Sequence, residues 1–213
     1  HQLHRRQRQM CIRDREDMER LTALTPHVLA AVGSPVDASA ATAHGTLGAV
    51  EAVLDKALND ARPGRALVHG CGAVGGTVAR HLVEHGWTVF TVDLDREKAN
   101  VPGATPLPDS CAWWELNLDL LLPCSISGLI NAEMATALKT PAVVPAANAP
   151  FQQPQLADDL RRRGVMVLPD PLVNAGAVIA DSIERFSPDA WKDAGAKDVY
   201  AFCLLYTSPS PRD

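Results

Sequence analysis

The chain has 213 residues, 46% of them hydrophobic and 21% charged, and a formal net charge of −5 at pH 7. This length supports one core or about one and a half domains, and the negative charge argues against nucleic acid as a partner. No apolar run reaches the roughly 18 residues of a membrane-spanning helix, and the five cysteines, at 11, 71, 111, 124 and 203, form no CxxC pair. We expect a cytoplasmic protein with neither disulfides nor a metal site.

The two ends differ in composition from the rest of the chain. Residues 5–14 are rich in arginine and glutamine, and the last six residues read Ser-Pro-Ser-Pro-Arg-Asp. Both ends resemble translated sequencing adaptor, so we expect residues 1–15 to be adaptor-like and disordered and residues 203–213 to be an adaptor-like tail. A nucleic-acid arm or nuclear signal is the alternative interpretation of the basic head.

A helical lead-in is predicted over residues 16–60. Residues 16–24 suit one or two helical turns, and breakers follow at Pro26 and over 33–35. Asp37 is a plausible N-cap, and small and apolar residues then recur at helical spacing over 38–58. This long helix ends before the Ala-Arg-Pro-Gly sequence at 61–64.

Strands and helices alternate along the remainder of the chain. Strands are predicted at 66–69, 88–92, 118–122, 141–145 and 165–168, and helices at 73–85, 130–138, 153–163 and 173–185, with a proline-rich stretch at 101–109. This alternation implies right-handed crossovers and a parallel sheet covered on both faces. We predict an α/β fold with a Rossmann-type doubly wound parallel sheet over residues 61–186, followed by a truncated C-terminal segment over 187–202.

The first predicted strand runs directly into a GxGxxG turn that opens a helix. Gly70 permits the tight turn, Gly72 lets the backbone approach a pyrophosphate, and Gly75 lets the helix lie close to the strand. The predicted phosphate-binding residues are Gly70, Cys71, Gly72, Ala73, Val74, Gly75 and Gly76. A glycine-rich turn in some other parallel sheet is the alternative interpretation.

The next predicted strand ends at Asp93, which lies 23 residues after Gly70. A carboxylate at this spacing accepts hydrogen bonds from the adenosine ribose of a dinucleotide. It also disfavours a 2′-phosphate, since two negative charges would face each other. The sequence therefore predicts NAD rather than NADP.

Three later strand ends carry polar or small residues that belong at the same edge of the sheet. Cys124, Ser125 and Ile126 follow one strand, and Asn148 and Asn174 follow the next two. Cys124 is either a nucleophile or, in the favoured interpretation, a small residue beside the cofactor. The two asparagines are either turn residues or ligands of a ribose, a carboxamide or a substrate amino acid. The histidines at 27, 44, 69, 81 and 85 show no shared face or metal spacing.

Over residues 16–186 the chain resembles the glutamate/leucine/phenylalanine/valine dehydrogenases, most of all the leucine and phenylalanine branch. The shared residues are Asp17-Met18, Thr42-Ala43-His44-Gly45, Gly70 to Gly76, Asp93, Pro123-Cys124, Ala146-Ala147-Asn148, Pro169-Asp170 and Asn174-Ala175-Gly176. The resemblance implies NAD-dependent oxidative deamination of an L-amino acid to a 2-oxo acid and ammonia. It also implies that the full-length protein is a homo-oligomer.

The resemblance assigns roles to single residues. Thr42 would hold the nicotinamide carboxamide, Asp93 the adenosine ribose, and Asn174 would lie near the nicotinamide ribose. Cys124, Ser125 and Ile126 would line the cofactor groove. Asn148 would meet both cofactor and substrate, and Val178 and Asp181 would contact the substrate. A carboxylate at 181 would disfavour leucine, although a solvated helix residue is the favoured interpretation of Asp181.

The chain departs from the family pattern at three places where glycine or asparagine is usual, now Ser127, Ala149 and Ala177. Their Cβ atoms narrow the groove or oppose a positive φ. The family's catalytic lysines and aspartate would fall upstream of Met18, so no catalytic residue is retained. We therefore expect a dehydrogenase fragment that binds NAD weakly or not at all and does not turn over substrate. The alternatives are a non-catalytic NAD-sensing module and a shikimate- or alanine-type dehydrogenase.

Overall fold

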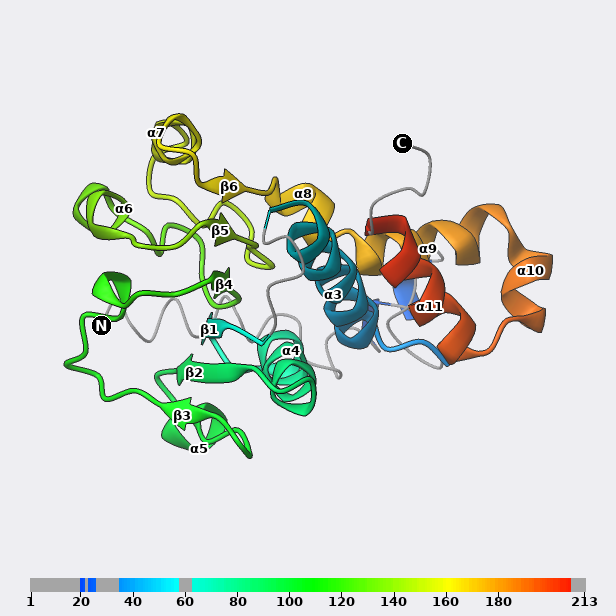
Figure 1. The fold of residues 1–213 in the computed structure, drawn as a ribbon. Helices are drawn as coiled ribbons and strands as arrows, with labels where there is room; N and C mark the ends of the chain where they lie inside the picture. The colour runs from blue at the N-terminus through cyan, green and yellow to red at the C-terminus, as the bar shows by residue number, and fades with distance from the viewer. Residues whose placement is uncertain (1–19, 22, 26–34, 58–62, 208–213) are drawn as a thin grey trace.

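The computed structural model describes residues 20–21, 23–25, 35–57 and 63–207. At its centre is a parallel sheet with the strand order β3-β2-β1-β4-β5-β6 (Figure 1). The strands are β1 (Arg65–His69), β2 (Thr88–Val92), β3 (Thr105–Pro106), β4 (Leu120–Pro123), β5 (Ala142–Val143) and β6 (Met166–Val167). Strand order reverses between β1 and β4, which is the topology of a doubly wound Rossmann-type sheet. The predicted fold class is confirmed.

Helices cover both faces of this sheet. On one face lie α3 (Ala38–Ala57) and α4 (Ala73–Glu84), and on the other the 3₁₀ helix η1 (Trp113–Glu115), α6 (Ala132–Ala137) and α7 (Gln155–Arg162). Strand β1 shows why both faces of the sheet need cover. On one face Ala66 and Val68 pack with α3 and α4, whereas on the other Leu67 packs with Trp113, and all are buried. A strand buried on both faces reads as a continuous apolar run.

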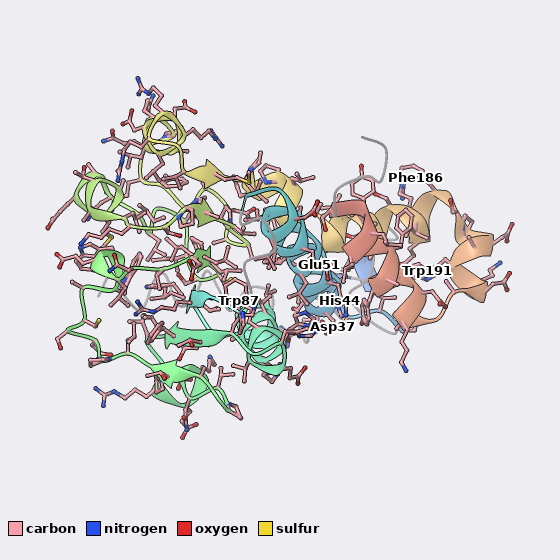
Figure 2. All side chains as sticks on the ribbon, in the orientation of Figure 1. Asp37, His44, Glu51, Trp87, Phe186 and Trp191 are labelled. Atoms are coloured by element: carbon pink, nitrogen blue, oxygen red, sulfur yellow. The ribbon has the colours of Figure 1, made fainter. Side chains whose placement is uncertain are left out.

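The remaining helices are α5 (Arg96–Ala99), α8 (Asp170–Val173), α9 (Gly176–Phe186), α10 (Pro188–Asp193) and α11 (Ala196–Thr207). Helices α9 and α11 lie beside α3, away from the sheet, and α10 lies beyond them against α9 (Figure 1 and Figure 2). A small separate core joins them to α3 through Val36, Ala41, Ala180, Val199 and Cys203. None of the described helices is both long enough and apolar enough to cross a membrane.

Several predicted boundaries need correction. The predicted helix 173–185 begins three residues later, as α9 at Gly176, and the short helix α8 over Asp170–Val173 was not predicted. The predicted strand 141–145 shortens to β5, because Pro141 and Pro145 flank it and proline donates no hydrogen bond to a sheet. Within the proline-rich stretch 101–109, the two-residue edge strand β3 was not predicted.

Helix α11 includes the first residues of the predicted tail, 203–207. Residues 203–207 continue α11 without a break, and the Thr207 hydroxyl donates a 2.7 Å hydrogen bond to the Gly45 carbonyl of α3. A Cβ on Gly48 would lie 2.1 Å from the Leu204 carbonyl oxygen, so α11 rests directly on α3. Residue 203 is therefore no structural boundary. The adaptor-like head and residues 208–213 lie outside the described residues.

Candidate cofactor site

The glycine turn connects β1 to α4 under tight steric limits. Gly70 has φ = 95°, in the left-handed region that favours glycine, and its N–H donates a 2.7 Å hydrogen bond to the Val92 carbonyl of β2. A Cβ on Gly70 would lie 2.6 Å from Ser125, and a Cβ on Gly75 would lie 1.9 Å from the Gly70 carbonyl oxygen. Two of the three motif glycines are therefore required by the fold itself.

Gly72 differs from its two neighbours in the motif. It is the N-cap of α4, and a Cβ built on it meets no atom within 4 Å. The first N–H groups of a helix have no acceptor within that helix, so those of Ala73, Val74 and Gly75 are directed out of its N-terminal end. The N-terminus of a helix of this length also carries a partial positive charge. The structure thus leaves an open space suited to an anion beside Gly72.

Asp93 lies just beyond the end of β2 and contacts the turn directly. Its Oδ2 accepts a 2.7 Å hydrogen bond from the Cys71 N–H, and its Oδ1 accepts a 2.9 Å hydrogen bond from the Asp95 N–H. Each carboxylate oxygen can accept a further hydrogen bond. Asp93 therefore fixes the glycine turn and keeps acceptor capacity for a ligand hydroxyl. Beside it, the Leu94 side chain is fully exposed.

The loop after β4 adjoins the same turn. The Cys124 N–H donates a 2.7 Å hydrogen bond to the His69 carbonyl, and Ile126 is half exposed. Burial raises the pKa of the Cys124 thiol to about 12 and that of the Cys71 thiol to about 11. Both are protonated near pH 7 and are poor nucleophiles. This supports the interpretation of Cys124 as a small residue lining the site.

Thiol labelling tests this interpretation. At pH 8 we expect iodoacetamide to alkylate Cys111, which is half buried in a loop, well before Cys71 or Cys124. The physical reason is that alkylation requires the thiolate, which the raised pKa values make scarce. Peptide mass spectrometry over a time course measures the order. Labelling of Cys124 as fast as that of Cys111 would revive its role as a nucleophile.

The two predicted amides meet at the edge of the sheet. Asn174 lies between α8 and α9, and its Nδ2 donates to Asn148 Oδ1 at 2.8 Å and to the Ala146 carbonyl at 3.2 Å. The Asn174 side chain is thereby fixed and leaves the Asn148 amide group able to donate outward. The pair is consistent with a site that orients a polar ligand.

The structure also shows the backbone strain at the three positions that depart from the family pattern, Ser127, Ala149 and Ala177. Among the described residues, Ala149 is the only non-glycine with a positive φ, at 43°, which costs about 1–2 kcal/mol for an L-residue. Its N–H donates a 2.8 Å hydrogen bond to Asp170 Oδ2, which holds this conformation. Ser127 and Ala177 do not have a positive φ, so the backbone carries no such strain at these two positions.

Thr42 on α3 lies next to the start of α9. A Cβ on Gly176 would lie 2.0 Å from the Ala41 carbonyl oxygen and 2.8 Å from the Thr42 nitrogen. The Thr42 hydroxyl donates a 2.9 Å hydrogen bond to the Ala38 carbonyl. Because Asn174 is only two residues before Gly176, the fold brings α3 and the asparagine loop together, as the predicted site requires.

The two predicted substrate-contacting residues lie on α9. Val178 is 66% exposed, and Asp181 is half buried with its Oδ1 shielded from solvent and lacking a hydrogen-bond partner within the described part of the chain. Burial raises the pKa of Asp181, and the nearby Glu184 carboxylate adds to the effect. Asp181 is thus not a simply solvated helix residue.

Two side-chain arrangements were missed at the sequence level. His81, in the last turn of α4, and His85, its C-cap residue, do share a face, where their ring centroids lie 4.0 Å apart in a stacked arrangement. His69 Nδ1 lies 2.9 Å from the Ser125 Oγ, inside the predicted cofactor site. The first pair follows from the four-residue spacing, whereas nothing in the sequence links residues 69 and 125. In the described ranges, no group of three or more His, Cys, Asp or Glu side chains is placed to hold a metal ion.

The fold and this edge of the sheet define a Rossmann-type α/β domain. The sequence profile of the Glutamate/Leucine/Phenylalanine/Valine dehydrogenase family matches residues 94–194. The chain is 29% identical over 167 residues to a phenylalanine dehydrogenase of Lysinibacillus sphaericus, and 32% identical over 154 residues to a valine dehydrogenase of Streptomyces albus. The chain belongs to the glutamate/leucine/phenylalanine/valine dehydrogenase family.

Solved structures agree with this family. The L-tryptophan dehydrogenase of Nostoc punctiforme superposes with a TM-score of 0.65 at 26% identity, covering 78% of this chain and 52% of that one. A glutamate dehydrogenase of Thermus thermophilus shares the fold, with a TM-score of 0.67 at 23% identity. The two bacterial relatives are matched over 74% and 68% of this chain but only 44% and 42% of their own lengths. The chain spans less than half of each.

Proposed function

We propose that this chain is the NAD-binding part of an enzyme that oxidatively deaminates an L-amino acid to a 2-oxo acid and ammonia. The observation that carries the proposal is the contact between Asp93 and the glycine turn, where the carboxylate at the end of β2 accepts a hydrogen bond from the Cys71 N–H. A ribose-binding acid and a phosphate-binding turn are thereby joined at one point. Family membership supports the reaction class.

The residues of the site fit a dinucleotide. The open space at Gly72 admits the two phosphates beside the first N–H groups of α4. Asp93 retains acceptor capacity for the adenosine ribose, and its charge opposes a 2′-phosphate. The fully exposed Leu94 and the half-exposed Ile126 offer apolar surface at the ends of β2 and β4 for an adenine ring. We therefore favour NAD over NADP.

Bound NAD would supply the hydride acceptor for the reaction. Within this chain, the fixed Asn174 and the outward-directed Asn148 would orient the nicotinamide ribose and the amino group of the substrate. Thr42, next to Gly176, would hold the carboxamide. The proton acceptor and the positive group that polarises the forming imine are assigned by the family resemblance to a part upstream of Met18.

The substrate and the cellular context belong to the same proposal. The named relatives are dehydrogenases of phenylalanine, valine or tryptophan, and an L-amino acid, as a small-molecule substrate, is the corresponding substrate class here. The part-buried Asp181 carboxylate on α9 favours a side chain other than leucine. Assembly of the full-length protein into a homo-oligomer and a cytoplasmic location complete the proposal.

Cofactor selectivity tests this proposal. Because two of the three departures from the family pattern leave the backbone unstrained, we expect weak but measurable binding of NADH. We expect NADPH to bind at least about tenfold more weakly, a difference of about 1.4 kcal/mol. Fluorescence titration of the reduced cofactors measures both affinities. Equal affinities would contradict the role of Asp93, and no binding of either at millimolar concentration would contradict the proposed cofactor.

A further inference from the structure

His69 is held in a defined position at the point where the strand order reverses. It is the last residue of β1, and its imidazole is half buried. The ring packs edge-on against Trp113, with centroids 5.1 Å apart and an interplanar angle of 62°. Trp113 is itself buried and packs against Trp114. The imidazole therefore has little freedom to reorient.

A hydrogen bond of the imidazole crosses from β1 to the loop after β4. His69 Nδ1 lies 2.9 Å from the Ser125 hydroxyl oxygen. Burial lowers the pKa of His69 below its usual value, and the residue's own backbone and the Asp93 carboxylate only partly oppose this effect, so the neutral ring predominates at pH 7. A neutral imidazole nitrogen either donates to a hydroxyl or accepts from it. The Ser125 hydroxyl is fixed in both cases.

Ser125 forms part of the wall of the crevice. A Cβ on Gly70 would lie 2.6 Å from the Cα and Cβ of Ser125, so this residue touches the glycine turn. The main chain of His69 holds the same loop, since its carbonyl accepts a hydrogen bond from the Cys124 N–H at 2.7 Å. Main chain and side chain of His69 thus tie the loop after β4 to the turn. In doubly wound sheets, ligands bind in the crevice at this reversal of strand order.

We propose that His69 is a positioning residue for the dinucleotide, acting through its hydrogen bond to Ser125 to hold the loop after β4 against the glycine turn. This inference rests on the proposed function. In the simpler interpretation His69 is a packed core residue, and its substitution changes dinucleotide binding through the loss of ring volume. Our inference assigns the change in binding to the hydrogen bond between the His69 Nδ1 and the Ser125 hydroxyl.

The test compares NADH affinity in four variants by fluorescence titration. His69→Leu and Ser125→Ala each remove the hydrogen bond, and we expect each to weaken NADH binding by about tenfold. The double variant is expected to be weakened by about tenfold as well, because both changes remove the same interaction. In His69→Asn the side-chain amide lies near the position of the imidazole Nδ1, and we expect affinity within about threefold of the original chain.

The outcomes separate the inference from the proposed function. If the original chain binds NADH and His69→Leu binds it equally well, His69 is a packing residue and the inference is overturned. A weakening of about a hundredfold in the double variant, as for independent effects, would also overturn it, as would failure of His69→Asn to restore affinity while its melting temperature is unchanged. If His69→Leu fails to fold, Ser125→Ala and His69→Asn still decide the question. Absence of NADH binding by the original chain defeats the proposed function itself.

Discussion

Replacement of Gly75 by alanine is expected to destabilise the chain by about 3 kcal/mol or more. The reason is steric: the added Cβ would lie 1.9 Å from the Gly70 carbonyl oxygen and 2.9 Å from the Cys124 Cβ. Neither the Gly70 carbonyl nor the Cys124 Cβ, which is fixed to the backbone, can move aside, so α4 must separate from β1. For a chain of this size the melting temperature should fall by roughly 6–12 °C. Thermal unfolding followed by circular dichroism measures the shift.

Gly72→Ala is the matched control for this experiment. The same methyl group at Gly72 meets no protein atom within 4 Å, so only the loss of a favourable N-cap residue is expected, at most about 1 kcal/mol. The added Cβ would however occupy the space proposed for the pyrophosphate, and NADH binding should weaken by at least about tenfold. A Gly72→Ala variant that binds NADH normally would show that the phosphates do not lie there.

Removal of the Asp93 carboxylate is expected to change both stability and cofactor choice. In Asp93→Ala the N–H groups of Cys71 and Asp95 lose their acceptor, which costs about 1–3 kcal/mol. The ribose would lose a ligand and the 2′-phosphate a repelling charge, so NADH affinity should fall at least about tenfold while NADPH affinity falls less. Titration of both cofactors gives the ratio of affinities.

Asp95→Ala controls for a general loss of negative charge near the turn. Asp95 lies two residues away and caps α5, where its Oδ1 accepts a hydrogen bond from the Glu97 N–H at 3.0 Å. This variant should lose stability at α5 and keep the selectivity of the original chain. If Asp93→Ala and Asp95→Ala shift the NADH-to-NADPH ratio equally, the effect comes from net charge and not from a specific contact.

Much of the fold was predictable because the apolar runs and glycine turns of the sequence indicate the same strands and helices that the parallel sheet contains. The strands β1 and β2 are short apolar runs, and the turn between β1 and α4 uses glycines whose roles the structure explains sterically at Gly70 and Gly75. The start of α9 was predicted three residues too early, at Val173, because Val173 fits the apolar spacing of the helix that follows. The cause lies in packing: Gly176 must approach the Ala41 carbonyl of α3, and no local signal reports that contact.

The site was predictable only in part for a similar reason. Asp93 follows from a fixed spacing after the glycine turn, and Asn148 and Asn174 follow from the rule that parallel strands end at one edge. The bond between His69 and Ser125 depends on β1 and β4 being neighbours in the sheet, although β2 and β3 separate them in sequence. A partner 56 residues away cannot be read from periodicity.

The most direct test of NAD binding at the glycine turn is an amide chemical-shift titration of the ¹⁵N-labelled chain with NADH. We predict the largest shifts at the N–H groups of Cys71 to Val74 and at Asp93 and Leu94, with smaller ones at Ser125 and Ile126. The far end of α4, at His81 and His85, should remain unchanged. Saturable shifts centred on the glycine turn would support the account, whereas shifts confined to other surfaces, or none at millimolar NADH, would contradict it.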